Sequence, residues 1–281
     1  MKRLATTAEL EAMANRVRQG IVTGVFHAKS GHPGGSLSCA DLLTYLYFNE
    51  MNVDPQNPTA EDRDRFVLSK GHGAPALYSV LAHMGYFPVK DLETLRHIGS
   101  YLQGHPDMKR VPGVDMSSGS LGQGVSAACG MALAAKIQKK GYRVYCMLGD
   151  GEIEEGQVWE AAMFASHKKL DNLCLIVDNN GLQIDGKVEE VCSPYPIDEK
   201  FQAFGFEVTE IDAHNFEEME KALNFARANQ NGKPTVIIAK SVKGKGVSFM
   251  ENVVNWHGVA PNEEQFNSAM QELLEGGNGD V

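Results

Sequence analysis

The chain has 281 residues, 43% of them hydrophobic and 22% charged, which is an ordinary composition for a globular protein. Its formal net charge of −10 argues against nucleic acid and anionic membranes as partners, because both would repel an acidic surface. No apolar run is long enough to span a membrane, and the charged, amphipathic N-terminal segment lacks the apolar centre of a signal peptide, so we expect a cytoplasmic protein.

Helix-like and strand-like segments alternate along the chain. Residues 6–29 predict a helix that opens with a capping box of Thr6 and Glu9, and Ser38 with Asp41 predicts a second capped helix. Further helices are expected near 76–84, 121–140, 158–169 and 216–228, and strands near 66–69, 143–148, 173–178, 207–211 and 235–240. The strands are continuous apolar runs, which are typical of a parallel sheet buried on both faces. We therefore expect residues 1–281 to form one α/β domain with a doubly wound, mostly parallel sheet and helices on both faces.

The five cysteines include no C-x-x-C pair, and two of them fall within strand-like apolar runs. This pattern is typical of buried, reduced thiols in a reducing compartment, and it does not suggest a disulfide framework.

Two polar motifs follow consecutive buried strands. Gly149-Asp150-Gly151 ends the first strand, and Asp178-Asn179-Asn180 ends the next. A right-handed crossover brings both strand ends to the same edge of the sheet, where open α/β sheets bind ligands. A carboxylate, an amide oxygen and a backbone carbonyl just past Asn180 would suit Mg²⁺ and leave positions for phosphate oxygens. Each motif alone could be a turn or a strand end, but the pair predicts a metal and phosphate site.

Four of the nine histidines adjoin glycine, and such positions indicate loops. They are His32, His72, His105 and His257. Imidazole can donate or accept a proton near neutral pH, so these loops are candidates for proton transfer to and from a ligand. None shows the paired spacing of a zinc site. The other five histidines, which are His27, His83, His97, His167 and His214, read as surface or packing residues.

Two further segments are candidates for ligand contact. The run from Ser117 to Gly124 opens a helix of small residues, and backbone N–H groups at such a start suit an anion or a close ring contact. Lys243-Gly244-Lys245-Gly246 follows the last strand; it is either a solvated basic loop or a local positive charge for a phosphate.

These motifs together resemble transketolase. The matching segments occur in the family's order and cover nearly the whole chain: SGHPGGSLS, LSKGHGAPALY, QGHPD, SGSLGQG, GDGEIEEGQVWEA, DNNGLQIDG and KGKG…WHG. The spacing between GDG and NN also matches the signature of thiamine diphosphate enzymes. The resemblance implies a thiamine diphosphate-binding fold and the transfer of a two-carbon ketol unit from a ketose phosphate to an aldose phosphate.

The resemblance also implies roles for individual residues. Asp150, the Asn180 side chain and the Leu182 carbonyl would hold Mg²⁺, with Ca²⁺ or Mn²⁺ as possible substitutes. The cofactor would contact His72, Gly119, Ser120, Leu121, Gly151, Asn180, Lys243 and His257. His32, His105 and His257 would meet the donor sugar and move protons, and Glu155 would be the family's buried acidic residue near the cofactor.

The chain ends soon after the WHG motif, whereas full-length members of the family continue into a second and a third domain. The second domain supplies a glutamate to the cofactor and basic residues to the substrate phosphate. The resemblance therefore implies the N-terminal subunit of a split transketolase, with a separate C-terminal chain as partner and an α₂β₂ assembly. Two alternatives stay open: a related thiamine diphosphate transferase such as a 1-deoxyxylulose 5-phosphate synthase, and a non-catalytic cofactor-binding scaffold.

Overall fold

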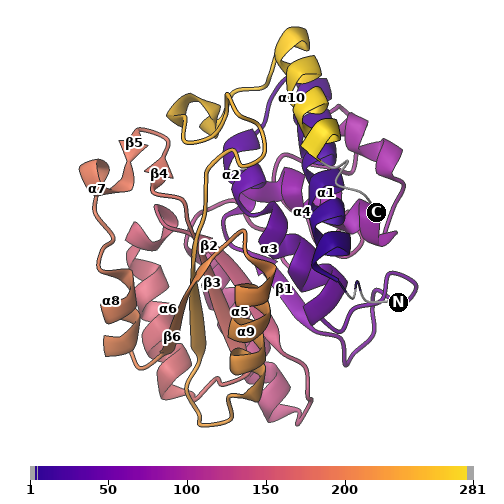
Figure 1. Ribbon diagram of the computed structural model, residues 1–281. Helices are drawn as coiled ribbons and strands as arrows, with labels where there is room; N and C mark the ends of the chain where they lie inside the picture. Colours follow the sequence, from indigo (N-terminus) through magenta and orange to yellow (C-terminus); the bar gives the residue numbers. More distant parts are fainter. Residues whose placement is uncertain (1–3, 5, 277–281) are drawn as a thin grey trace.

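A computed structural model describes residue 4 and residues 6–276, and its centre is a five-stranded parallel sheet (Figure 1). The strands are β1 (Arg65–Leu68), β2 (Val144–Gly149), β3 (Leu173–Asn179), β6 (Glu207–Asp212) and β7 (Thr235–Lys240). Their order across the sheet is β1-β2-β3-β7-β6, with every neighbouring pair parallel. The predicted parallel α/β sheet is thus confirmed.

Helices cover both faces of this sheet, as a doubly wound fold requires. One face carries α1 (Thr7–Ala28), α2 (Pro33–Ser38), α3 (Ala40–Tyr45), α4 (Ala74–Met84), α9 (Phe216–Ala228) and α10 (Glu263–Gly276). The other face carries α5 (Gln123–Ile137), α6 (Gly156–His167) and α8 (Ile197–Ala203). Short elements complete the chain: η1 (Leu46–Glu50), η2 (Gly71–Gly73), η3 (Val89–Thr94), η4 (Glu152–Glu154), η5 (Val254–His257), α7 (Val188–Val191), and a hairpin of β4 (Leu182–Gln183) with β5 (Gly186–Lys187).

The strands are apolar at consecutive positions because helices bury both faces of the sheet. All six residues of β2 are buried, and successive side chains point to opposite sides of the sheet. Tyr145 and Met147 join the core under α1 and α4, whereas Val144, Cys146 and Leu148 join the core under α5 and α6. A strand that is buried on both sides therefore reads as a continuous apolar run.

The second predicted helix cap is wrong. The Ser38 side chain does not cap a helix; its Oγ donates to Asp178 Oδ2 at 2.6 Å, deep in the protein. Helix α3 starts after Cys39 without a side-chain cap, and Asp41 contacts Arg18 and His214 instead. The capping box of Thr6 and Glu9 at α1, in contrast, is confirmed. Both Ser38 and Asp41 are used for long-range contacts that local sequence does not reveal.

Several elements were not expected from the sequence, above all α10, which lies alongside α1 in Figure 1. The Phe266 ring stacks on Phe26 at 4.1 Å between centroids, so the end of the described chain packs against its beginning. All five cysteines are free thiols; four are buried as expected, but Cys192 is exposed. Across the residues that the structure describes, every helix is too short or too polar to cross a bilayer.

Candidate cofactor site

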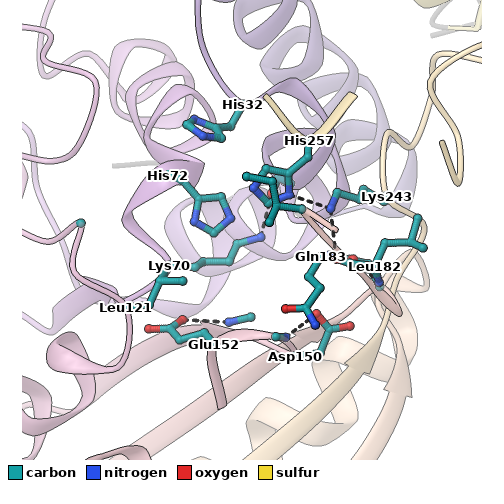
Figure 2. A pocket seen from close by; sticks show the side chains of 16 residues that line it. His32, Lys70, His72, Leu121, Asp150, Glu152, Leu182, Gln183, Lys243 and His257 are labelled. Carbon is teal, nitrogen blue, oxygen red and sulfur yellow. Dashed lines mark hydrogen bonds between the residues drawn. The ribbon is translucent and has the colours of Figure 1, made fainter. Parts of the chain in front are cut away.

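A cavity of about 280 Å³ opens at the carboxyl edge of the sheet (Figure 2). The segments that follow β1, β2, β3 and β7 all contribute to its wall. Ten of the predicted site residues line it: His32, His72, Gly119, Leu121, Asp150, Gly151, Asn180, Leu182, Lys243 and His257. Gly149 of the Gly149-Asp150-Gly151 motif lines it as well, and the sequence reasoning missed Gly35, Lys70, Glu152, Gln183 and Ile184, which also line it. Three predicted residues, His105, Ser120 and Glu155, are not part of this wall.

The two polar motifs converge, as the βαβ argument predicts. Gly149 lies opposite Asp178 in the parallel register of β2 and β3, so Asp150 and Asn180 extend from neighbouring strand ends. Asp150 Oδ2 accepts a hydrogen bond from the Gly181 amide at 2.5 Å, and Asn180 Oδ1 accepts one from the Leu182 amide at 3.1 Å. The Asp150 carboxylate therefore lies against the turn at residues 180–182, which also carries the Asn180 amide oxygen and the Leu182 carbonyl.

The Asp150 carboxylate is 2% exposed. Burial, together with the nearby negative charge of Asp178, raises the pKa of Asp150 to about 6, although amide hydrogen bonds from Gly181 and Gly151 oppose the shift. A divalent cation at this position would compensate the buried charge. Among the described residues no three His, Cys, Asp or Glu side chains converge as ligands, so a cation here would rely on amide and carbonyl oxygens. This donor set fits Mg²⁺ and does not fit a zinc site.

The two lysines of the KGKG segment have different environments. Lys243 is 1% exposed and points into the cavity, where its Nζ donates to the Leu182 carbonyl at 3.0 Å and to His257 Nδ1 at 2.9 Å (Figure 2). Burial lowers the pKa of Lys243 to about 8, while Asp150 opposes the shift. Lys245 points outward and pairs with Glu251 at 3.6 Å. Lys243 thus belongs to the cavity, whereas Lys245 belongs to the surface of the same loop.

The four glycine-flanked histidines lie close together, although their loops are far apart in the sequence. The His32 ring centroid lies 5.4 Å from His72, 5.5 Å from His257 and 6.3 Å from His105. The rings of His72 and His257 stack at 5.3 Å. His105 is exposed and sits against Gly119 at the rim of the cluster.

The pKa of each of these four histidines is lowered, chiefly by burial, which favours the uncharged ring. Burial, reinforced by the Arg96 guanidinium, lowers the pKa of His32 to about 4, and burial with the Lys243 charge lowers the pKa of His257 to about 3. The pKa of His72 also falls well below its usual value, chiefly by burial. Because the Lys243 ammonium donates to Nδ1 of His257, the ring proton of His257 is on Nε2. Such neutral rings can donate one hydrogen bond and accept another.

A buried ion pair that the sequence reasoning missed supports the floor of the cavity. Lys70 is 1% exposed and Asp178 is fully buried; Lys70 Nζ pairs with Asp178 Oδ2 and donates to the Gly35 carbonyl at 2.7 Å. Burial alone would raise the pKa of Asp178, but the Lys70 charge and the hydrogen bonds from Lys70, Ser241 and Ser38 hold it below its usual value. The only signal in the sequence was the position of Lys70 beside the histidine loop.

Within this single chain the acidic residue that is buried beside the cavity is Glu152, whereas the predicted Glu155 lies at the surface. Glu155 is exposed, whereas Glu152 is 2% exposed and lines the cavity. Glu152 Oε1 accepts from Ser69 Oγ at 2.5 Å and from the Gly122 amide at 2.9 Å, and its Oε2 accepts from the Gly149 amide at 2.9 Å. The short helical turn η4 directs Glu152 inward and leaves Glu155 at the surface, ahead of α6. Ser120 is likewise exposed, beside the cavity-lining Gly119 and Leu121.

The fold and the site define a class of protein: an α/β protein with a polar cavity at the carboxyl ends of its parallel strands, the place where open α/β sheets bind ligands. Residues 10–275 match the model of the transketolase thiamine diphosphate binding domain, so the chain belongs to the transketolase family and forms its thiamine diphosphate-binding, N-terminal part. The predicted family and fold are confirmed.

Two bacterial relatives match over nearly their full length. The chain is 46% identical over 265 residues to the 6-deoxy-6-sulfo-D-fructose transketolase subunit SqwG of Clostridium sp. (strain MSTE9), covering 94% of this chain and 96% of that protein. It is 45% identical over 271 residues to an apulose-4-phosphate transketolase subunit of Phocaeicola vulgatus, covering 96% of this chain and 94% of that protein.

Solved transketolases share the fold but are longer. The transketolase of Campylobacter jejuni superposes with a TM-score of 0.89 at 36% identity, covering 96% of this chain and 43% of that chain. The transketolase of Leishmania mexicana gives the same TM-score at 32% identity, with 42% of that chain covered. The present chain thus spans less than half the length of these solved enzymes.

Proposed function

We propose that this chain holds thiamine diphosphate through Mg²⁺ and acts as one subunit of a two-chain transketolase. Asp150, the Asn180 amide oxygen and the Leu182 carbonyl would bind the cation, and Ca²⁺ or Mn²⁺ could replace it. The buried carboxylate of Asp150 supports this assignment, because its pKa is raised chiefly by desolvation, which a bound cation would relieve. Lys243, whose Nζ donates to the Leu182 carbonyl in this structure, would be available to a diphosphate oxygen if the cation took that carbonyl.

The remaining cavity residues would hold the cofactor and the donor sugar. Gly151 and Asn180 would bring backbone and amide groups to the diphosphate, and Gly119 and Leu121, with the exposed Ser120 between them, would form the side toward the pyrimidine ring. Bound thiamine diphosphate supplies the carbanion chemistry that cleaves the carbon–carbon bond next to a ketose carbonyl.

The histidine cluster would orient the sugar and move protons to and from its hydroxyl groups. Neutral imidazoles at His32 and His257 can each accept or donate a hydrogen bond, which supports this role at neutral pH. His72 packs against His257 on the cofactor side, while His105 faces the rim. Glu155, exposed in this chain, would contact a neighbouring subunit near the cofactor.

We further propose that the other half of the active site comes from a separate C-terminal chain, in an α₂β₂ assembly in the cytoplasm. Two relatives of nearly the same length are named as transketolase subunits, which supports a partner chain. Their names contain a sulfo sugar and a sugar phosphate, so we propose an anionic ketose as donor and an aldose phosphate as acceptor. Residues 1–281 would act as one domain of that assembly.

The observation that carries the proposal is the convergence of Asp150, Asn180, Lys243 and the histidine cluster on one cavity. The test is to purify the tagged chain from its native host, identify any chain that accompanies it, and assay ketol transfer with thiamine diphosphate and Mg²⁺. We expect a stoichiometric second chain and activity that depends on both. Full turnover by the rigorously pure single chain would contradict the two-chain proposal.

A further inference from the structure

Three charged or polar side chains form a linked group outside the cavity, on the far side of the loop at residues 241–246. Arg18 extends from α1, Asp41 from α3, and His214 from the connection between β6 and α9. Asp41 Oδ2 accepts hydrogen bonds from both of the others, at 2.5 Å from Arg18 Nη2 and at 2.6 Å from His214 Nδ1. Arg18 and Asp41 are 8% and 5% exposed. None of the three lines the cavity.

This group contacts the loop on both sides of Lys243. The Val242 amide donates to His214 Nε2 at 3.0 Å, immediately before Lys243. Arg18 Nε donates to the Lys245 carbonyl at 3.1 Å, two residues after it. His214 and Arg18 therefore hold the loop backbone at two points, and both of these side chains bind the same oxygen of Asp41.

The contacts fix the proton position on His214. Since Nε2 accepts from a backbone amide, Nδ1 must carry the proton that is donated to Asp41. One neutral tautomer satisfies both contacts, whereas a ring protonated on both nitrogens would face the Val242 amide with a second donor. Asp41 is ionised in this arrangement: burial would raise its pKa, but the Arg18 charge and the hydrogen bonds from His214 and Arg18 hold that pKa below its usual value.

The loop needs such support because of what it carries. Lys243 is 1% exposed and its charged amine lies in the cavity, so desolvation acts against its buried position. Gly244 and Gly246 have φ angles of +82° and +93°, a left-handed backbone that glycine adopts without strain but also leaves flexible. A Cβ on Gly246 would lie 2.8 Å from Arg18 Cδ, so the glycine also allows Arg18 to pass beneath the loop.

We propose that Arg18, Asp41 and His214 are positioning residues, which hold the loop at residues 241–246 so that Lys243 stays in the cavity. The effect on cofactor binding rests on the proposed function of Lys243, but the effect on the loop does not. If these three residues only stabilised the fold, loss of their contacts would lower the stability of α1, α3 and the sheet together. It would then have no separate effect on the loop.

The test compares His214→Ala with His214→Gln in the full chain, and uses His167→Ala as the control, because His167 is exposed on α6 across the sheet. Hydrogen exchange is followed for the loop at residues 241–246 and for the buried strands β2 and β3. We expect His214→Ala to accelerate exchange in the loop roughly tenfold, the scale expected when one buried amide loses its acceptor. Exchange in β2 and β3 should stay unchanged. His214→Gln should lie closer to the wild type, because its side-chain oxygen can accept from the Val242 amide.

Affinity for thiamine diphosphate in the presence of Mg²⁺ is measured on the same variants, assembled with the partner chain. We expect His214→Ala to weaken it roughly tenfold, again the scale of one lost hydrogen bond in a buried site, with His167→Ala unchanged. Unaltered loop exchange in His214→Ala, or equal acceleration in the loop and in β2 and β3, would overturn the positioning role. A mobile loop with undiminished cofactor affinity would overturn its link to binding. If the wild type itself binds no thiamine diphosphate, the proposed function fails, while the exchange data still decide the positioning role.

Discussion

Replacement of Lys70 by methionine is the sharpest test of the buried ion pair beneath the cavity. Methionine keeps most of the length of the side chain and its apolar contacts but removes the charge. Asp178, which is fully buried, would then lack its only cationic hydrogen-bond partner among the described residues, although Ser38 and Ser241 would still donate to it. The substitution therefore isolates the cost of an uncompensated carboxylate.

The expected loss of stability follows from this geometry. Removal of one partner from a buried ion pair costs about 3–5 kcal/mol, and we expect the lower end because the two serine hydrogen bonds remain. For a chain of this size, a loss of about 3 kcal/mol corresponds to a fall in Tm of roughly 6–12 °C. This is a large fraction of the stability of an ordinary domain.

The assay is urea and thermal unfolding at pH 7 of Lys70→Met, Asp178→Asn and the double variant. The double variant should recover part of the loss, because it no longer buries an unpaired charge. A loss below about 1 kcal/mol in Lys70→Met, the scale of an exposed pair, would refute the reasoning. So would a double variant whose loss equals the sum of the two single losses.

Three further substitutions test other parts of the account. Gly244→Ala places a Cβ 2.3 Å from a backbone oxygen at a left-handed position, so thiamine diphosphate affinity measured by calorimetry should fall, whereas Gly141→Ala, with open space around it, should not change it. Tyr145→Phe removes the hydrogen bond of 2.7 Å to Glu50, so urea unfolding should show a loss of about 1–2 kcal/mol with unchanged cofactor affinity; equal stability would contradict this. Asp41→Asn removes a carboxylate with a depressed pKa, so its stability deficit should be full at pH 7 and shrink as the pH falls below about 4; a deficit independent of pH would contradict this.

The framework of the site could be predicted from the sequence because two local patterns determine it. Buried parallel strands read as apolar runs, and the polar residues directly after them must lie at one edge of the sheet. Asp150, Asn180 and Lys243 each follow such a run within a few residues. The glycine-flanked histidines were recognisable for a similar reason, since glycine marks the loops that reach the edge.

Residues whose role depends on long-range contacts could not be predicted. Glu152 and Glu155 stand in one acidic stretch, and only the direction of the turn η4 decides which of them is buried. The role of Lys70 could not be predicted, because its partner Asp178 lies on β3, more than a hundred residues further along the chain. His214 read as an ordinary packing residue, because its partners come from α3 and from the loop after β7.

Titration of thiamine diphosphate into the assembled enzyme tests the central proposal most directly. Calorimetry is run on the wild type and on Asp150→Asn, each with Mg²⁺ and with a chelator. The account predicts tight binding only for the wild type with Mg²⁺, because Asp150 supplies the sole carboxylate of the proposed cation site. Equal binding with and without the cation, or equal binding by Asp150→Asn, would contradict it.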